Sequence, residues 1–384
     1  MTAGLDPVVP APVVPSYDGH GLAGVLPSVL ASLGVGTGPV ELPPARRAVV
    51  VLVDGLGLEL LRQRKGHAPY LRSLLAEARD LTAGFPSTTA TSMGTFGTGL
   101  PPGAHGLTGY QVEIPGEGRL FNELSWEDGP NPERWQPEQT VLQRSASAGI
   151  ATTMVAPGYF DGSGLTRAAL RGAMFRGSED LGGRVAAALA AVRSAPRALV
   201  YLYWGDLDRT GHVHGCESWQ WGDELEHIDR ELRRLGEQLP ADCSLSVVAD
   251  HGMVDIPLEA RTDVAHDAEL RDGVRLVGGE MRALQLYCEP GAAETVLATW
   301  QARLGEQGWI VSREEALTRG WFGPVHERVL PRIGEVIAAF HAPIGVVDSR
   351  VMRPVILGLI GQHGSMTSAE QSVPLLHLPA AGSD

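Results

Sequence analysis

Carboxylate and imidazole side chains directly follow several apolar runs of this sequence, at the points where strands are expected to end. Asp54 ends the run "VVVLVDGLG", Asp250 and His251 end "SLSVVADHG", and His363 lies in "GLIGQHGSM". In open α/β sheets, ligands bind beyond the carboxyl ends of the strands, so residues this far apart in sequence can meet in one crevice. Aspartate and histidine both bind borderline divalent metals, so we expect a metal centre.

A second acidic and imidazole-rich stretch, "LVYLYWGDLDRTGHVHG", also follows an apolar run. Asp208 and His212 are four residues apart, which places them on the same face of a helical turn. Asp206 and His214 lie beside them. Taken alone, these features have ordinary explanations, because Asp54 could cap a helix and Asp208 with His212 could form a surface hydrogen bond.

The adjacent pair Asp250 and His251 is harder to explain in this way. Two ionisable groups at the end of a buried strand lose hydration unless something coordinates them. His363 alone is weak evidence, and His105, in "PPGAHGL", is expected to be a structural loop histidine. Together the residues share ligand type and strand-end position, and two clusters indicate two divalent ions, zinc first, with manganese or iron as alternatives.

The stretch "FPSTTATSMGTFGTG", residues 85–99, places a Thr/Ser block before a helical run of small residues. Free N–H groups at a helix N-terminus favour phosphate oxygens. A bound metal could also lower the pKa of a threonine hydroxyl there and make it a nucleophile. From this block alone, the simpler interpretation is that Ser87 or Thr88 caps a helix.

Strand-like and helical segments alternate along the chain. Continuous apolar runs near residues 47–53, 150–157, 197–205 and 244–249 are typical of strands buried on both faces. Helical periodicity separates them, as in "SEDLGGRVAAALAAVRS" and "DELEHIDRELRRLGEQL". The order predicts an α/β fold whose central sheet is mostly parallel, with helices on both faces.

Two segments fit this alternation less well and are interpreted as insertions at the rim of the sheet. Residues 105–135 contain few periodic apolar residues. Residues 255–350 mix short strand-like runs, such as "VRLVGG" and "RALQLYCE", with one helix, "AAETVLATWQARLGE". We predict one catalytic domain over residues 1–384, with 255–350 as a small cap insertion within it. Residues 1–17 are expected to be extended.

Composition excludes several classes of protein. The formal charge of −14 disfavours stable binding to nucleic acid, which needs lysine and arginine to displace counterions. No apolar run is long enough to span a bilayer, and the N-terminus lacks the features of a signal peptide. The three cysteines are odd in number and widely spaced, so a reducing, cytoplasmic compartment is expected.

The order of the motifs resembles the alkaline phosphatase superfamily, and more closely its type I phosphodiesterase/nucleotide pyrophosphatase branch. The resemblance is carried by "VVVLVDGLG", "FPSTTATSMGTFGTGLPPGAHGL", "DLDRTGHVHG", "VVADHGM" and "GQHG" in that order. It covers residues 45–380 and leaves the two insertions poorly matched. It implies an alkaline-phosphatase-like fold and a two-metal hydrolase.

The resemblance also implies a role for each site residue. Asp208, His212 and His363 would hold one metal, and Asp54, Asp250 and His251 the other, with Thr89 completing the shell of the second. Thr89 would be the nucleophile, and Thr88 is the nearest alternative. Asp206 and His214 would support the ligands.

One position departs from the family pattern. Nucleotide pyrophosphatases of this branch usually carry an asparagine three residues after the nucleophile, where it binds a phosphoryl oxygen. Here that position is Ser92. Its hydroxyl would donate one hydrogen bond to substrate but reaches less far, which affects substrate preference more than reaction class.

These inferences predict a hydrolase of small phosphate esters, most of all phosphodiesters or nucleotide pyrophosphates, through a phosphothreonine intermediate. A phosphomonoesterase or phosphonate hydrolase on the same site is the alternative, and a non-catalytic metal- or phosphate-binding protein is the alternative from another class. Trp204, Tyr203, Tyr110 or Trp321 could stack on a base, although aromatic residues near strand ends more often belong to the core. The oligomeric state is left open.

Overall fold

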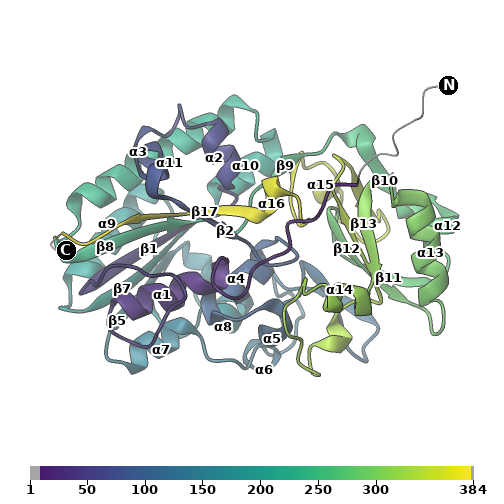
Figure 1. The fold of residues 1–384 in the computed structure, drawn as a ribbon, viewed down its shortest axis with the longest axis horizontal. Coiled ribbons are helices and arrows are strands. Elements are labelled where there is room, and N and C mark those ends of the chain that lie inside the picture. Colours follow the sequence, from purple (N-terminus) through teal and green to yellow (C-terminus); the bar gives the residue numbers. More distant parts are fainter. Residues whose placement is uncertain (1–8, 382–384) are drawn as a thin grey trace.

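The computed structural model describes residues 9–381, and a seven-stranded sheet forms their centre (Figure 1). In spatial order its strands are β2 (Arg79–Thr82), β17 (Ser372–Leu378), β8 (Cys243–Val248), β1 (Arg47–Val53), β7 (Ala198–Trp204), β5 (Ala151–Ala156) and β6 (Met174–Gly177). Neighbouring strands are parallel except at β17, which runs antiparallel to both β2 and β8. The predicted mostly parallel α/β sheet is confirmed.

The central strands are buried on both faces, as their continuous apolar sequences predict. Every residue of β7 and β8 is buried, and so is every residue of β1 after Arg47. The register pairs Val53 at the end of β1 with Trp204 at the end of β7. Residues that follow these strands therefore start from the same edge of the sheet.

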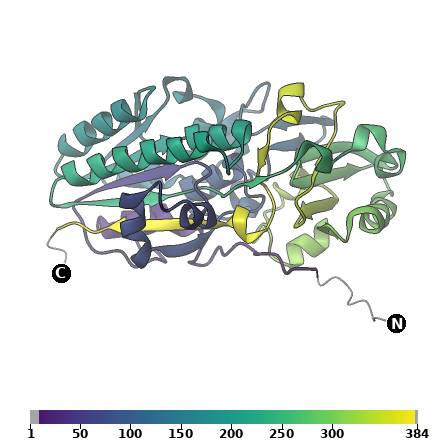
Figure 2. The same ribbon diagram turned by 90° about the horizontal axis from the view of Figure 1, so that it is seen from above.

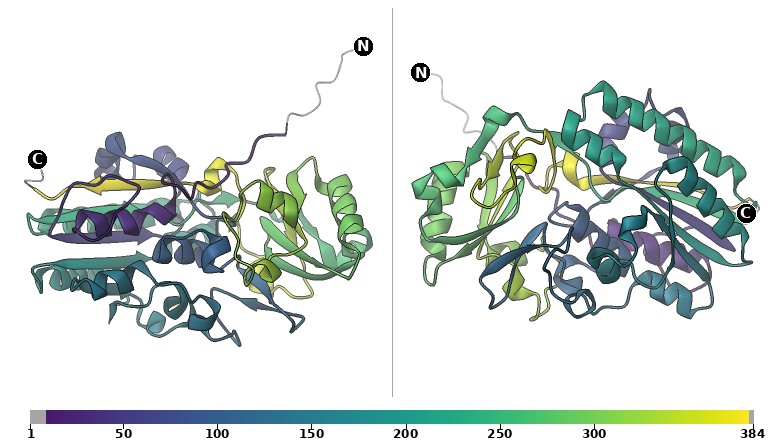
Figure 3. Two further views of the ribbon diagram at one scale, coloured as in Figure 1. Left: turned by 60° about the horizontal axis from the view of Figure 1, so that its bottom comes forward. Right: turned by 180° about the vertical axis from the view of Figure 1, so that it is seen from behind.

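Helices cover both faces of this sheet, which Figures 1 and 3 show from different sides. One layer consists of α1 (Val25–Ser32), α4 (Thr89–Thr98), α7 (Val141–Ser147) and α8 (Gly164–Ala169). The other contains α2 (Leu58–Gln63), α3 (Pro69–Leu74), α9 (Leu181–Arg193) and α11 (Trp219–Gln238). The helix α10 (Asp206–His214) begins immediately beyond β7. Among residues 9–381, no helix is both long and apolar enough to cross a bilayer.

A second sheet lies beyond one end of the first, as Figure 2 shows. Its strands, in spatial order, are β11 (Val274–Glu280), β12 (Ala283–Cys288), β14 (Val336–Phe340) and β13 (Gly308–Ser312), all antiparallel. The helix α13 (Ala293–Leu304) covers one face through Val296 and Trp300. The other face packs through Trp309 and Ile337 around Phe85 of the main fold. All of these strands fall within residues 255–350.

Short elements complete this end of the molecule. They are α12 (Ala268–Arg271), α14 (Arg313–Thr318), α15 (Pro354–Leu357), α16 (Ser368–Gln371) and the pairs β10 (Arg261–Asp263) with β15 (Gly345–Val347), and β9 (Val254–Asp255) with β16 (Gly361–Gln362). In the other predicted insertion, β3 (Gln111–Ile114) and β4 (Arg119–Asn122) form a hairpin between α5 (Pro102–His105) and α6 (Pro132–Trp135). The sequence predicted an insertion here but no strands, because each strand is only four residues long.

Residues 1–17 were expected to be extended. Residues 1–8 lie outside the described residues, so the structure tests this prediction for residues 9–17. Residues 9–17 contain no regular secondary structure and run along the second sheet. The Trp309 indole donates to the Pro10 carbonyl at 2.8 Å, and the Val13 N–H donates to the Met366 carbonyl at 2.9 Å.

Candidate active site and metal centre

Three strand ends of the central sheet bring acidic and imidazole side chains to one edge. Asp54 follows β1 directly, and Asp250 and His251 follow β8 after one residue. Asp208 and His212 lie on α10, which starts beyond β7. His363 arrives from the far end of the chain, directly after β16. Because parallel strands end at a common edge, these distant residues become neighbours.

Asp208, His212 and His363 form one group that could hold a cation. Nε2 of His212 lies 3.3 Å from Oδ2 of Asp208 and 3.3 Å from Nε2 of His363. Nε2 of His363 lies 3.8 Å from Oδ1 of Asp208. One carboxylate and two imidazole nitrogens on a small triangle are a donor set that suits zinc.

The second group surrounds His251. Its Nε2 lies 3.3 Å from Oδ1 of Asp54, 3.4 Å from Oδ2 of Asp250 and 3.3 Å from Oγ1 of Thr89. Asp54, His251 and Asp208 also form a three-residue set whose ligand atoms lie within 4.8 Å of one another. Asp208 therefore lies between the two groups, which the sequence did not indicate.

Hydrogen bonds on the far side of each imidazole direct Nε2 into the site. Nδ1 contacts a backbone carbonyl in all three: His212 at Gly361 (2.6 Å), His251 at Gly252 (3.0 Å) and His363 at Ser87 (2.9 Å). A carbonyl can only accept, so Nδ1 carries a proton, and in the neutral ring it is Nε2 that has the free lone pair. Metal-binding histidines are usually oriented in this way.

The carboxylates also fit a cation. Asp54 Oδ1, Asp208 Oδ1 and Asp250 Oδ2 are buried and have no hydrogen-bond partner among the described residues. Buried carboxylate oxygens are normally paired, because an unpaired buried charge is costly. Three such oxygens beside three available imidazole nitrogens fit one or two divalent cations.

The electrostatics of the second group point the same way. Burial raises the pKa of Asp54 well above its usual range, and repulsion from Asp250 and Asp208 adds to this effect. Burial also raises the pKa of Asp250. Burial lowers the pKa of His363 well below its usual range, with repulsion from His251 as the next cause. Positive charge placed between the carboxylates would offset their repulsion.

Asp208 and His212 form a charged pair in the first group. Burial by itself would lower the pKa of His212, but attraction to Asp208 outweighs it and raises the pKa to about 9. Burial likewise opposes ionisation of Asp208, yet His212 holds its pKa below the usual range. A metal at this group would compete with a proton for His212, so its affinity should fall as the pH is lowered.

Thr89 is the first residue of α4, and its hydroxyl faces the second group. Oγ1 lies 3.4 Å from Oδ2 of Asp54 as well as 3.3 Å from His251. The capping alternative does not apply, because Thr88 at the N-cap position makes no side-chain cap and the Ser87 hydroxyl donates to the Ser365 carbonyl. Both Thr88 and Thr89 line the cavity described below.

Ser92 lies one turn further along α4. Its hydroxyl donates to the backbone carbonyl of Asp250 at 2.9 Å, and the residue is fully buried. In this conformation Ser92 ties α4 to the segment that carries Asp250 and His251. Contact with substrate at Ser92 stays a prediction.

Two residues of this site were not predicted to contact the candidate ligands, since Tyr203 was considered only as a stacking aromatic and Glu280 had no predicted role. The Tyr203 hydroxyl donates to Oδ2 of Asp54 at 2.6 Å. Glu280, at the end of β11, lines the cavity with Oε2 3.8 Å from Nδ1 of His363. Burial raises the pKa of Glu280 to about 8. The only indication in the sequence was that each residue lies at the end of a strand-like run.

The remaining candidates lie outside these contacts. Asp206 pairs with Arg209 at 3.0 Å, and His214 contacts Gln220. His105 is fully buried, with Nε2 3.1 Å from the Thr95 hydroxyl. Of the four candidate stacking aromatics, only Tyr110 lines the cavity, whereas Trp204 and Trp321 are buried in the core.

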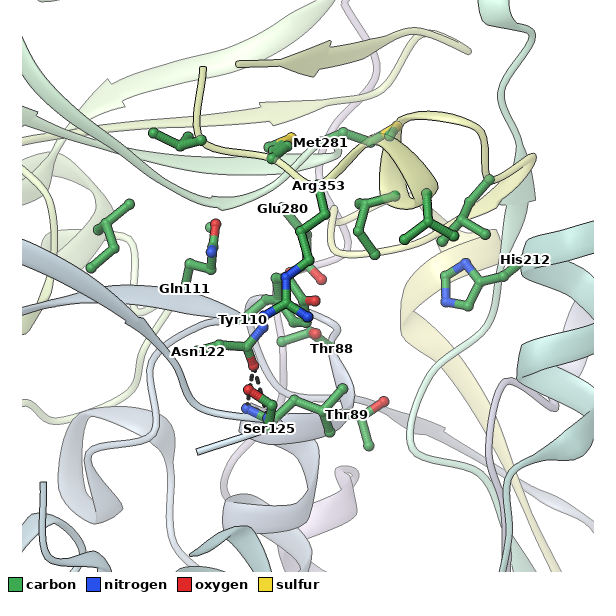
Figure 4. Close-up of a pocket in the computed structure, with 18 of the residues that line it drawn as sticks. Thr88, Thr89, Tyr110, Gln111, Asn122, Ser125, His212, Glu280, Met281 and Arg353 are labelled. Carbon is green, nitrogen blue, oxygen red and sulfur yellow. Dashed lines mark hydrogen bonds between the residues drawn. The ribbon is translucent and has the colours of Figure 1, made fainter. Parts of the chain in front are cut away.

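A cavity of about 620 Å³ opens over the site. Figure 4 shows Thr88, Thr89 and His212 on its floor and side, with Glu280, Tyr110 and Asn122 around them. The walls come from the hairpin insertion, from β11 and from the segment that leads to His363. Its volume is in the range of small-molecule sites.

Residues 48–365 match the model of the type I phosphodiesterase/nucleotide pyrophosphatase family. The chain belongs to this family. The match runs from β1 to just beyond His363 and so includes every candidate ligand. The resemblance stated from the motifs is confirmed.

The sequences of two curated relatives align with part of this chain. The rat and mouse proteins named ectonucleotide pyrophosphatase/phosphodiesterase family member 7 are each 24% identical, over 244 and 239 residues. These alignments cover 58% and 57% of this chain and 53% of each relative. The chain therefore spans about half the length of the curated relatives it matches.

Solved structures share the fold. Murine ectonucleotide pyrophosphatase/phosphodiesterase 5, as an inactive variant with AMP, superposes with a TM-score of 0.69 at 18% identity, covering 86% of this chain and 87% of that one. Phosphonoacetate hydrolase from Sinorhizobium meliloti 1021, in complex with phosphonoacetate, superposes with a TM-score of 0.66 at 19% identity, covering 88% and 93%. The alkaline-phosphatase-like architecture is confirmed.

Proposed function

We propose that this protein is a metal-dependent hydrolase of small phosphate esters, with phosphodiesters or nucleotide pyrophosphates as substrates. The main support is the position of the Thr89 hydroxyl on the floor of a cavity. Its oxygen lies 3.3 Å from Nε2 of His251 and 3.4 Å from Oδ2 of Asp54. Family membership supports the reaction class. Two structural neighbours were solved with AMP and with phosphonoacetate, which supports a small ligand that carries phosphorus.

In this proposal the ligand sets follow the two groups. Asp208, His212 and His363 hold one cation, and Asp54, Asp250 and His251 hold the other, with Asp208 near both. Zinc is the proposed metal because three imidazole nitrogens contribute, and manganese or iron would also accept the carboxylates. When bound, the cations supply the positive charge that favours the Thr89 alkoxide and neutralises the transferred phosphoryl group.

Residues of the chain then perform the chemical steps of the reaction. The Thr89 oxygen attacks phosphorus in line, so that a Thr89 O–P bond forms and the bond to the leaving oxygen breaks. Asp54 and His251 orient the hydroxyl. The N–H groups in the first turn of α4 face the phosphoryl oxygens. Water then attacks the phosphothreonine, which releases the product and restores the hydroxyl.

A cytoplasmic location remains part of the proposal. It is supported by the three cysteines, Cys216, Cys243 and Cys288, all of which are buried and free. We propose that residues 255–350 act as a cap on the catalytic domain, because Glu280 at the end of β11 and the next residue, Met281, line the cavity.

Replacement of the nucleophile tests this function. Thr89→Ala should lower the rate on methyl p-nitrophenyl phosphate by at least about a thousandfold, because it removes the attacking oxygen. Elemental analysis should find its metal content unchanged, whereas Asp250→Ala should lose metal. The rate of p-nitrophenol release, with zinc or manganese added, is the measurement, and p-nitrophenyl phosphate provides the monoester comparison.

Two neighbouring threonines provide matched controls. Thr91 is buried on the same helix, and its hydroxyl has no hydrogen-bond partner within residues 9–381, so Thr91→Ala should stay within a fewfold of wild type. If Thr88→Ala abolishes turnover while Thr89→Ala does not, the nucleophile is Thr88. If neither ester is hydrolysed although Thr89→Ala still binds phosphate, the non-catalytic alternative is favoured.

A further inference from the structure

The cavity above Thr89 has one wall made almost entirely of apolar side chains. Val351, Met352, Val355, Ile356 and Leu359 all line the cavity from the segment that includes α15, and we call these five residues the apolar wall. Figure 4 shows carbon-rich side chains of this cavity gathered between Met281, Arg353 and His212. The hairpin insertion forms the other, more polar end of the cavity through Tyr110, Asn122 and Ser125, and its Leu120, Phe121 and Leu124 also line the cavity.

Backbone contacts fix the apolar wall beside the first metal-binding group. The segment ends at Ile360, whose N–H donates to the His212 carbonyl at 2.7 Å. The next residue, Gly361, accepts from Nδ1 of His212 at 2.6 Å. His363 follows two residues later. The wall therefore adjoins the Asp208, His212 and His363 group rather than the second group around His251.

The apolar side chains here are left in contact with solvent. Val355 is 68% exposed, Val351 is 49% exposed, and Val213, which lines the same side from α10, is 50% exposed. Single exposed apolar residues are ordinary, but a group of them on one wall of a cavity marks a binding surface. An apolar ligand group would remove this surface from water.

The charged groups near the wall are already paired. Arg353 forms an ion pair with Glu127 of the hairpin insertion at 2.8 Å, and Arg209 pairs with Asp206 at 3.0 Å. The Gln362 side chain donates to the Leu359 carbonyl. This side of the cavity therefore offers little to a second phosphate or to the hydrogen-bonding edge of a base.

We propose that the apolar wall binds the leaving group, and that the preferred substrates are phosphodiesters whose leaving alcohol carries an alkyl or alkylaryl chain. The proposal rests on the proposed function, in which Thr89 attacks from the second group and the leaving oxygen departs toward Asp208, His212 and His363. The retained ester group then lies at the polar end, beside Tyr110 and Asn122. The bond that breaks joins phosphorus to the apolar alcohol, which leaves with a proton from water.

Two homologous series of diesters test which side of the phosphate the wall contacts. In methyl 4-alkylphenyl phosphates the chain is on the leaving group, and lengthening it barely alters the acidity of the phenol. In p-nitrophenyl alkyl phosphates the chain is on the retained group. We expect kcat/KM to rise about two- to fourfold per added methylene in the first series, as apolar burial predicts, and to stay flat in the second.

Substitutions in the apolar wall test whether it causes the dependence of kcat/KM on chain length. The double substitution Val355→Ser with Ile356→Ser should flatten the chain-length dependence in the first series. Met174→Ser is the matched control, because Met174 is 65% exposed on β6 and does not line the cavity. It should leave the dependence unchanged.

The possible outcomes separate this proposal from the proposed function. Hydrolysis that does not depend on chain length in the first series overturns the apolar leaving group and leaves the phosphodiesterase in place. A rise in the second series, or a wall variant with the wild-type dependence, also overturns it. If no diester of either series is hydrolysed, both proposals fail.

Discussion

Asp54 illustrates how the two oxygens of one carboxylate can be separated in function. Oδ2 accepts a hydrogen bond from the Tyr203 hydroxyl at 2.6 Å, and Oδ1 is buried without a hydrogen-bond partner among residues 9–381. Gly205 leaves room for this hydroxyl, since a Cβ at that position would lie 2.6 Å from the Tyr203 oxygen. The phenol thus holds the carboxylate so that Oδ1 faces His251 and the candidate metal site.

Tyr203→Phe should weaken metal binding by about tenfold or more, because the loss of a group that orients a ligand typically costs 10- to 100-fold. Competition with a chromogenic chelator measures this affinity in the absence of substrate. Tyr201→Phe is the control. Tyr201 is buried on the same strand, and the one hydrogen-bond partner of its hydroxyl among residues 9–381 is the Met93 sulfur, at 3.6 Å. Equal losses in the two variants would contradict the assigned role.

At the scale of elements, small residues in α4 allow the helix that begins at Thr89 to pack closely. A Cβ on Gly97 would lie 1.9 Å from the Ala169 carbonyl of α8, and one on Gly94 would lie 2.5 Å from the His105 ring. All residues of α4 are buried. The run "TSMGTFGTG" therefore sets the position of α4, and with it the position of Thr89, the proposed nucleophile.

Gly97→Ala should lower the free energy of unfolding by about 1–3 kcal/mol, because α4 and α8 must move apart to admit the methyl group. It should also lower kcat, since Thr89 moves with the helix. Denaturant unfolding and ester hydrolysis measure the two effects. For comparison, a Cβ on Gly182 of α9 meets only side-chain atoms at 3.3 Å or more, so Gly182→Ala should be tolerated. A stable Gly97→Ala protein with normal activity would contradict this packing argument.

At the scale of the whole molecule, a buried ion pair connects the second sheet to the segment that carries His363. The guanidinium of Arg282, next to β12, contacts Glu370 of α16 at 3.0 Å, and both side chains are almost fully buried. Glu370 also accepts from the Ser365 N–H and the Thr367 hydroxyl. The turn between β11 and β12 is therefore tied to α16 by this pair, and removing one partner of a buried pair is strongly destabilising.

The pH dependence of stability should contain a contribution from His105. Burial, with Arg328 and Arg332 nearby, lowers the pKa of His105 to about 3, against about 6.5 in an unfolded chain. Between these values the unfolded chain binds more protons, so stability rises with pH. The contribution is complete above pH 6.5 and is lost as the pH falls toward 3.

From pH 6.5 to pH 5, the wild type should therefore lose about 2 kcal/mol more unfolding free energy than His105→Gln. Chemical denaturation at both pH values, with a chelator present so that metal release does not contribute, measures the difference. His266→Gln serves as the surface control, because the His266 side chain is 82% exposed. A His105→Gln variant with the wild-type pH dependence would show that His105 does not cause the effect.

The order of strands and helices, the mostly parallel sheet and the family were all predicted correctly from the sequence. Runs such as residues 47–53 and 198–204 are apolar throughout, and burial of a continuous apolar run is a local property that favours a central strand. The candidate ligands were visible for a similar reason, since they stand directly after such a run or, for Asp208 and His212, within the helix that follows one. β17 was missed because an antiparallel strand with Pro374 in it lacks this pattern.

The contacts between side chains that are distant in sequence are visible only in the tertiary structure. The hydrogen bond between Tyr203 and Asp54, the position of Asp208 near both metal-binding groups, and the apolar wall beside His212 join residues up to about 150 positions apart. Such contacts depend on strand register and on how the insertions fold over the sheet edge. No local spacing encodes them, because the same residue pattern is compatible with many packings until the whole core has formed.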